Sequence, residues 1–234
     1  KAASLALRAG QITGIAGVSG NGQSALSDIV SGLMDPSSGT LSIAGAPCPA
    51  RWTPAAALAS GIGRIPEDRH KTGTIADFSL TENVLLETHG SPPFSRRGWI
   101  DRAAAETHAR TIISKYDVRC PGPDARIRLL SGGNMQKLIL GRVLEAGPMV
   151  VLANQPVRGL DIGAMAYVHG QLLAARDRGA AVLLISEDLN EVMQLSDVIH
   201  VISEGRLSPP IPRGTAGVAE LGLWMAGEGF SDAA

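Results

Sequence analysis

The sequence feature that most constrains the fold is a glycine-rich segment placed between a short apolar run and a helical pattern. Residues 17–24 read GVSGNGQS and follow the phosphate-binding pattern G-x-x-x-x-G-K-[ST] at every position but one. Gln23 stands where that pattern has lysine. We call residues 17–24 the phosphate loop. The chain is therefore expected to fold around a strand–loop–helix unit whose loop lacks its usual positive charge.

Apolar patterns on both sides of the phosphate loop supply the context that such a loop needs. The run 12–16 predicts a buried strand, and the apolar spacing over 25–33 predicts a helix, so that loop N–H groups and a helix N-terminus point at one anion. Further strands are expected at 41–44, 63–65, 149–153, 182–186 and 198–203, and helices at 164–176 and 220–225. Strands that alternate with helices indicate a parallel sheet covered on both faces.

The region from about 74 to 144 is expected to be mostly helical and to form a helical subdomain. Asp101 is the expected N-cap of one helix, whose apolar face comprises Ala105, Ala109, Ile112, Ile113 and Tyr116. Near the carboxyl end, Pro209, Pro210 and Pro212 are interpreted as a linker. The whole chain, 1–234, is expected to be one domain with a tail from about 208 to 234.

Size and composition exclude several classes of protein. The 234 residues suffice for one α/β domain with a full core, and no apolar run reaches the length of a transmembrane helix. The 21 basic and 22 acidic residues give a net charge of −1, which offers no reason to expect a nucleic-acid partner. Cys48 and Cys120 are expected to be reduced thiols. Since Lys1 follows no methionine, we expect the chain to begin inside a longer polypeptide.

A second motif, residues 130–137 or LSGGNMQK, identifies the family that the chain resembles. This signature segment is similar to the LSGGQ signature of the ATP-binding cassette family. A serine hydroxyl and free N–H groups at a helix N-terminus make a seat for an anion. The resemblance implies that this seat serves the γ-phosphate held by an opposite, partner domain. The residues it assigns there are Ser131, Gly132, Gly133, Asn134 and Gln136.

At three further positions of the family pattern, this chain has a side chain different from the one that the chemistry uses. The Walker B strand of the family ends in aspartate and glutamate, where this chain has Asn154 and Gln155, and Glu187 replaces the histidine of the switch segment. An amide carries no charge and takes up no proton at neutral pH. Asp161 of the family's D-loop is intact. The sequence therefore predicts a degenerate site with no catalytic residue of its own.

The resemblance also implies which residues would hold nucleotide and how weakly. The nucleotide-binding positions are Gly17, Ser19, Gly20, Asn21, Gly22, Gln23 and Ser24. Losing the lysine and a magnesium ligand together costs about 3–6 kcal/mol, or about 10²–10⁴ in affinity. ATP binding at this site is accordingly expected to be weak or absent, with magnesium bound only at the partner site.

The family resemblance implies an α/β fold of the P-loop NTPase type. It comprises a parallel sheet with flanking helices, the helical subdomain, and a partial antiparallel β subdomain at the amino end. Residues 65–73 and the ending 220–227 are similar to those of ATPases that import simple sugars or nucleosides, in which two cassettes are fused and the second reads like this chain. The partners implied are a fused or paired competent nucleotide-binding domain and membrane permease subunits, at the cytoplasmic face of the inner membrane. The resemblance implies that a separate binding protein and the membrane subunits select the cargo.

Two alternatives remain open at the level of sequence. An active phosphotransferase would need a basic residue at the phosphates and a carboxylate on magnesium, and neither is visible in the matching motifs. A soluble cassette protein that acts on DNA or ribosomes would be expected to carry basic insertions, which this near-neutral chain lacks. The histidines show no metal-ligand spacing, and the three tryptophans are scattered as packing residues.

Overall fold

The computed structural model describes residues 3–229, which divide into two compact units. The sheet unit comprises residues 3–64, 148–155 and 172–229, and the helical unit comprises residues 65–147 and 156–171. Each unit is therefore built from chain segments that are far apart in the sequence. Among residues 3–229, every helix falls short of the length and apolar character that a membrane-spanning segment needs.

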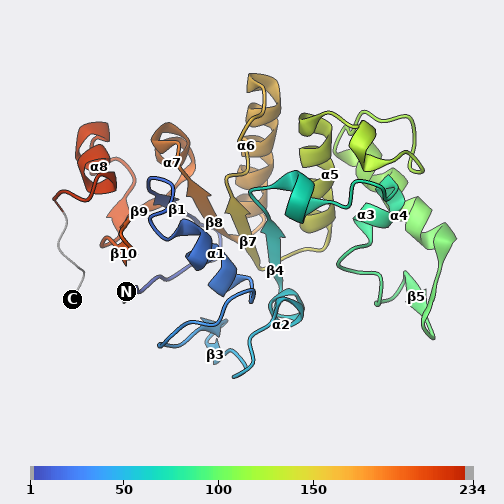
Figure 1. The fold of residues 1–234 in the computed structure, drawn as a ribbon, viewed down its shortest axis with the longest axis horizontal. Helices are drawn as coiled ribbons and strands as arrows, with labels where there is room; N and C mark the ends of the chain where they lie inside the picture. The colour runs from blue at the N-terminus through green and yellow to red at the C-terminus, as the bar shows by residue number, and fades with distance from the viewer. Residues whose placement is uncertain (1–2, 230–234) are drawn as a thin grey trace. The chain divides into compact units, whose positions relative to one another are not determined.

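The sheet unit is built on a mostly parallel sheet, which within the described residues has seven strands. Figure 1 shows β1, β7, β8 and β9 side by side. In spatial order the strands are β10 (Arg206–Leu207), β9 (Val198–Ser203), β1 (Ile12–Ala16), β8 (Ala181–Ser186), β7 (Val150–Asn154) and β4 (Ile62–Ile65), with β11 (Ile211–Pro212) also paired to β9. β1 runs parallel to β8 and β9, and β7 runs parallel to β8. The expected parallel sheet is confirmed.

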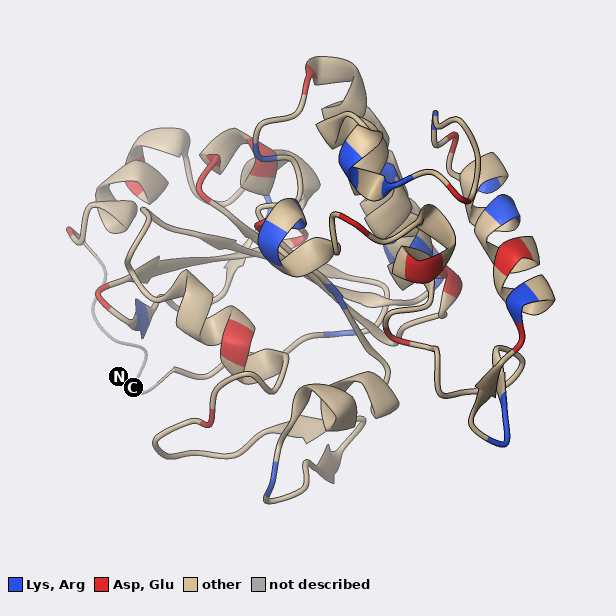
Figure 2. Cartoon of the chain, turned by 45° about the vertical axis from the view of Figure 1, so that its right-hand side comes forward, with Lys and Arg blue, Asp and Glu red and all other residues tan. Residues whose placement is uncertain are grey.

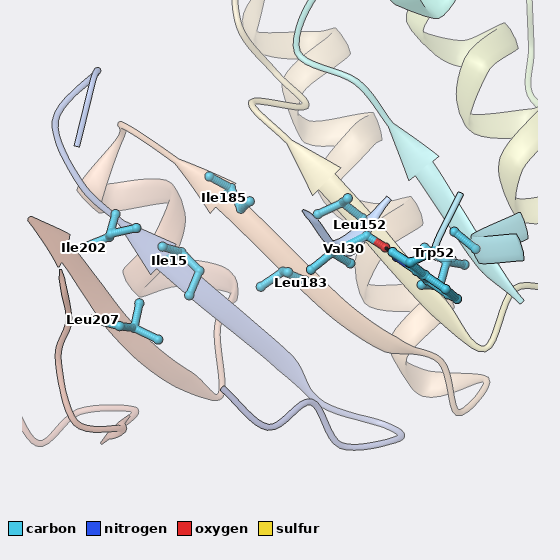
Figure 3. Packing of buried hydrophobic residues seen from close by; sticks show 10 residues of the cluster. Ile15, Val30, Trp52, Leu152, Leu183, Ile185, Ile202 and Leu207 are labelled. Atoms are coloured by element: carbon cyan, nitrogen blue, oxygen red, sulfur yellow. Dashed lines mark hydrogen bonds between the residues drawn. The ribbon is translucent and has the colours of Figure 1, made fainter. Parts of the chain in front are cut away.

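The core of the sheet unit explains why these segments form central strands. Every residue of β1 and β8 is buried, so both strands read as unbroken apolar runs, as strands covered on two faces do. On one face, Ile15, Leu183 and Ile185 pack with the cluster drawn in Figure 3. Trp52 closes this cluster, and its indole Nε1–H donates to the carbonyls of Ile29 and Val30 at 3.0 and 3.3 Å.

On the other face of the sheet, α7 (Leu189–Leu195) packs against β1 and β8 at very close range. A Cβ atom on Gly14 would lie only 2.1 Å from Oγ of Ser196 and 2.7 Å from Cγ1 of Val192. Only glycine leaves room for this approach of helix to strand. The small residue in the middle of β1 thus sets how closely α7 sits on the sheet.

The remaining elements of the sheet unit are short. Its helices are α1 (Gln23–Val30), α2 (Pro54–Ala59), α7 and α8 (Val218–Met225), and β2 (Ser42–Ile43) with β3 (Ala46–Pro47) forms a small antiparallel hairpin. The interpretation of the carboxyl-terminal prolines as a linker is wrong at Ile211 and Pro212, because these residues pair with β9. Proline is tolerated there since an edge strand does not use every N–H group in a ladder.

The helical unit contains α3 (Leu80–Val84), α4 (Arg102–Lys115) and α5 (Gly132–Glu145), which pack on one another. Asp101 caps α4 as expected by accepting from the N–H of Ala104 at 3.0 Å. The expected face of α4 is buried, although Ile113 is only half-buried. A two-stranded hairpin of β5 (Ser95–Arg96) and β6 (Trp99–Ile100), which the sequence patterns did not indicate, precedes α4. In Figure 2, α4 carries one acidic position among basic ones, namely Glu106 among Arg102, Arg110 and Lys115.

Helix α6 (Ile162–Asp177) begins in the second segment of the helical unit and continues into the third segment of the sheet unit. It matches the helix expected at 164–176. Two shorter turns complete the helical unit, namely the π-helical turn η1 (Arg69–Gly73) and the 3₁₀ turn η2 (Ile127–Leu129).

A buried histidine in β9 makes the stability of the sheet unit depend on pH. His200 is 4% exposed, its Nδ1 lies 2.7 Å from the carbonyl oxygen of Ser208, and burial lowers its pKa against the opposing effect of that carbonyl. The pKa of His200 is therefore lower in the folded protein than its unfolded value of about 6.5. The contribution of the neutral, buried histidine to the free energy of unfolding is fully present above about pH 6.5 and is lost as the pH falls toward the folded pKa. We expect urea midpoints to fall between pH 7.5 and pH 5.5, and to fall less in His200→Gln. Identical pH slopes in the two proteins would contradict this.

Candidate functional site

The phosphate loop connects the carboxyl end of β1 to α1, as a phosphate-binding loop must. Gly20 and Gly22 have φ angles of +87° and +115°, which side chains other than hydrogen rarely tolerate. Asn21 fixes the loop to the β9–β10 turn, because its side-chain oxygen accepts from the N–H of Glu204 at 3.1 Å and its carbonyl accepts from the N–H of Gly205 at 2.8 Å. Ser19 and Ser24 are exposed.

Gln23 does not project out of the phosphate loop but folds back onto it. Its Nε2 donates to the carbonyl of Val18 at 2.8 Å, and the side chain is only 6% exposed. A Cβ atom on Gly17 would lie 2.6 Å from the same Nε2, so the amide fills the interior of the loop. The group that replaces lysine thus bonds to the loop itself.

The other altered positions lie at the same edge of the sheet. Because β1, β8 and β7 are parallel, and Ala16 is level with Ser186 while Asn154 is level with Ile185, their carboxyl ends meet there. Asn154 and Gln155 are buried at 5% and 8% exposure. Gln155 has a φ of +49°, and its Oε1 accepts from the N–H of Glu187 at 3.4 Å. The structure therefore brings together the positions that the sequence grouped as one degenerate site.

The altered side chains at this edge differ from the groups that magnesium and a triphosphate prefer. Gln23, Asn154 and Gln155 are neutral, and magnesium prefers carboxylate oxygens together with phosphates. Glu187, the charged group among the four altered positions, would repel a phosphate. Among residues 3–229, no group of three histidine, cysteine, aspartate or glutamate side chains is placed to hold a metal ion.

In the helical unit the signature segment forms a capped helix N-terminus. Ser131 is the N-cap of α5, and its side chain is exposed. Its Oγ accepts from Nδ2 of Asn134 at 2.9 Å and, more weakly, from the backbone N–H of Asn134 at 3.5 Å. Gly132 and Gly133 form the first turn, whose N–H groups have no partner within a helix. The anion seat that the sequence predicts would be formed by these residues at this helix N-terminus.

Gln136 does not share that exposed seat. Its side chain is 1% exposed, and its Nε2 donates to the carbonyl of Pro156 at 2.8 Å. Its position in the signature segment is explained by this bond, which holds the chain after β7 to the helix α5. The expectation that Gln136 reaches a partner's nucleotide does not fit its burial.

Asp161 of the D-loop caps α6 within the same unit, since its Oδ1 accepts from the N–H of Ala164 at 2.9 Å. Ser131, Asn134 and Asp161 all line a pocket of about 300 Å³. The other lining residues are Arg119, Gly133, Lys137, Gly163, Ala164 and Tyr167. In this pocket Nζ of Lys137 lies 4.7 Å from the ring centroid of Tyr167. The signature segment and the D-loop thus border one hollow.

Lys137 is the centre of the electrostatic contacts around the pocket, because it contacts both Asp117 and Tyr167. Nζ of Lys137 donates to Oδ2 of Asp117 at 2.7 Å, and this hydrogen bond lowers the pKa of the Asp117 carboxyl. Burial, and then the charge of Asp117, raise the pKa of the Tyr167 phenol. Lys137 is therefore engaged by one carboxylate and one ring, while Arg119, the exposed Ser131 and the N-terminus of α5 also border the pocket.

Sequence reasoning missed the contacts of Arg69, which it considered only as part of the segment 65–73. Nη1 of Arg69 donates to the carbonyl of Arg158 at 2.9 Å, and Glu67 forms an ion pair with Arg158. The guanidinium also lies beside Gly132, where an added Cβ would be 3.3 Å from its Nε. Residues 65–73, the D-loop and the start of α5 are therefore joined inside the helical unit. No sequence pattern indicates this, because the contacts span about 90 residues.

Comparisons with known proteins agree with this geometry. Residues 1–158 match a family model described as ABC transporter. The chain is 46% identical over 224 residues to the guanosine import ATP-binding protein NupO of Bacillus subtilis. That alignment covers 96% of this chain and 44% of NupO. The chain is 38% identical over 232 residues to the nucleoside import ATP-binding protein NupA of Lactococcus lactis, covering 99% and 46%. The chain therefore spans less than half the length of these curated relatives.

Solved structures show the same fold at low sequence identity. A nucleotide-free ATP-binding cassette from an ABC transporter superposes with a TM-score of 0.75 at 22% identity, covering 90% of this chain and 84% of that one. A dimeric cassette in a post-hydrolysis state with ADP and Pi gives a TM-score of 0.75 at 21% identity, covering 91% and 89%. The P-loop NTPase-type α/β fold expected from the sequence is confirmed.

Proposed function

Because this chain belongs to the ABC transporter family, we propose that it is a degenerate cassette that lends its signature segment to a competent partner cassette. Its own phosphate loop holds ATP weakly or not at all and does not hydrolyse it. Magnesium is bound at the partner site alone. In this proposal the chain contributes an anion seat and a docking surface to an ATPase whose chemistry is carried out by the partner.

The observation that carries this proposal is the conformation of Gln23. A lysine at this position would direct a cation at the phosphates, whereas the Gln23 amide donates to the carbonyl of Val18 and is 6% exposed. An incoming phosphate would have to compete with that bond and would gain no ionic contact from it. The loop therefore keeps the backbone shape of a phosphate site without its charge.

The amides at Asn154 and Gln155 and the carboxylate of Glu187 support the same proposal. A general base must be able to take a proton, which a glutamine amide does not do at neutral pH. Gln155 instead accepts from the N–H of Glu187 at 3.4 Å. In contrast, Ser131 and the start of α5 keep the features that an anion seat requires. The side chains that would hold magnesium and activate water at the chain's own site are altered, whereas the signature segment keeps its serine and its helix N-terminus.

We further propose that the complete protein is the ATP-binding component of an importer of nucleosides or simple sugars. Its relatives NupO and NupA are named for guanosine and nucleoside import, and a ribose import ATP-binding protein of Bacillus licheniformis is 35% identical over 213 residues. That alignment covers 91% of this chain and 43% of the relative. The missing half would be the fused competent cassette, and the assembly would lie on permease subunits at the cytoplasmic face of the membrane.

The turnover of the chain by itself tests the proposal. With ATP and Mg²⁺ in excess, we expect phosphate release no faster than the background rate, because the groups that hold magnesium and activate water are absent. Phosphate release is the measurement, and Ser24→Ala is the control that identifies any activity of this loop. A rate near about 1 s⁻¹, within the usual range of enzymes, that disappears in Ser24→Ala would overturn the proposal.

A further inference from the structure

We propose that Asn134 is a positioning residue that fixes the direction of the Ser131 hydroxyl, so that this hydroxyl can act only as a donor toward an anion. The inference rests on the proposed function, because it concerns how the signature segment presents Ser131 to a nucleotide bound by the partner. It assigns to the asparagine of LSGGN a role that the pattern of the segment alone does not specify.

The orientation of the Asn134 amide is fixed by a backbone group. The N–H of Arg119, which can only donate, points at Oδ1 of Asn134 at 2.8 Å. The oxygen of the amide is therefore on the Arg119 side, and Nδ2 is on the Ser131 side, where it lies 2.9 Å from Oγ. Because one end of the amide meets a known donor, the other end must be the NH₂ group.

The loop that carries Arg119 is itself held by the same helix. One turn after Asn134, Nζ of Lys137 donates to the carbonyl of Asp117 at 3.0 Å and to its Oδ2 at 2.7 Å. The N–H of Val118 donates to the carbonyl of Ile113 at 2.9 Å, and the Val118 side chain is buried. Residues 117–119 are thus fixed at three points, so Asn134 is oriented by a rigid support.

The consequence for Ser131 follows from the capacity of a hydroxyl, which has one proton to donate and two lone pairs. Nδ2 and the backbone N–H of Asn134 both point at Oγ and occupy its acceptor side. Within residues 3–229, no acceptor takes the Ser131 proton. The free proton lies at an exposed helix N-terminus, where the N–H groups of Gly132 and Gly133 have no partner within the helix. A phosphate oxygen, which only accepts, matches this arrangement.

Two substitutions at position 134 separate this role from simple support of the fold. Asn134→Asp keeps the shape and can still accept from the N–H of Arg119, but its second oxygen would take the Ser131 proton and add a negative charge. Asn134→Ala loses both contacts. A purely structural role predicts that alanine is the worse substitution, whereas the positioning role predicts that aspartate is worse, and by more than the charge effect that remains in the Ser131→Ala background.

The experiment measures kcat/KM for ATP in the full ATP-binding protein assembled with its membrane subunits. We expect about a 10–100-fold loss for Asn134→Asp and about a 3–10-fold loss for Asn134→Ala, as for removal of one charge-assisted hydrogen bond and of its support. Equilibrium binding of a non-hydrolysable ATP analogue is the second readout, and it should weaken in the same order. Alanine worse than aspartate in both readouts would overturn the inference.

A double-mutant cycle with Ser131→Ala shows whether Asn134 acts through the serine. In the Ser131→Ala background, Asn134→Ala should have no further effect, and Asn134→Asp should keep only its charge effect. Full additivity would overturn the inference. If Ser131→Ala alone changes neither turnover nor binding, the proposed signature function fails instead. Gln194→Glu, an exposed amide-to-carboxylate change on α7, is the control for added charge, and thermal unfolding checks that each variant is folded.

Discussion

Replacing Gln23 with lysine is expected to tighten ATP binding by about 10–100-fold while turnover stays at background. The gain corresponds to restoring one charge-assisted hydrogen bond to a phosphate, which contributes about 1.5–3 kcal/mol. In the present structure this position donates to the carbonyl of Val18 instead. Turnover should not follow, because Gln155 still offers no group that takes a proton from water.

The measurement is the equilibrium affinity for ATP alongside phosphate release from the same preparation. Gln23→Met is the matched control, since it removes the bond to Val18 without adding a charge and should leave the affinity low. Full activity in Gln23→Lys would show that the interpretation of Gln155 is wrong. An affinity that does not respond to lysine would show that the phosphate loop no longer receives an anion at all.

Replacing Gly14 with alanine is expected to destabilise the protein by about 3 kcal/mol. Inserting a methyl group into a packed interior costs about 1–3 kcal/mol, occasionally more, and here the added Cβ would lie 2.1 Å from Oγ of Ser196. Ser196 is fully buried, so it has little room to move. The free energy of unfolding from urea titration is the measurement.

Two companion variants identify the cause of that loss. Ser196→Ala removes an Oγ that has no hydrogen-bond partner among the described residues, so it should be nearly neutral alone and should recover part of the loss in Gly14→Ala. Gly222→Ala lies in helix α8 with no atom within 4 Å of the new Cβ, and it should stabilise by about 0.5–1 kcal/mol. Equal effects at Gly14 and Gly222 would rule out the steric explanation.

The sequence predicted the central strands well because they are buried on both faces. Such strands appear as short apolar runs bounded by glycine or polar residues, as at Ile12–Ala16 and Val198–Ser203. Short antiparallel pairs were harder to predict. The hairpin β5–β6 has only two residues in each strand, and its turn depends on the positive φ of Arg97 and Gly98.

The sequence predicted which residues belong to the candidate site, but it did not predict which hydrogen bonds their side chains form. Family motifs placed Gln23, Gln155 and Ser131, whose spacing along the chain is distinctive. The inward fold of the Gln23 amide and the bond from Arg119 to Asn134 depend on side-chain directions and on contacts between distant segments. The burial of Gln136 contradicted a role assigned by its place in the motif, since residues in one turn of a helix point to different sides.

The helical unit is discontinuous in the sequence, because β7 separates its two segments, 65–147 and 156–171. Exchanging one contiguous DNA segment therefore could not transfer this unit alone to another cassette. A chimera would need four splice junctions, two of them flanking an eight-residue stretch that supplies a central strand to the other unit. Recombination between such genes is thus expected to exchange whole cassettes, and the signature segment and phosphate loop of one chain to be inherited as a pair.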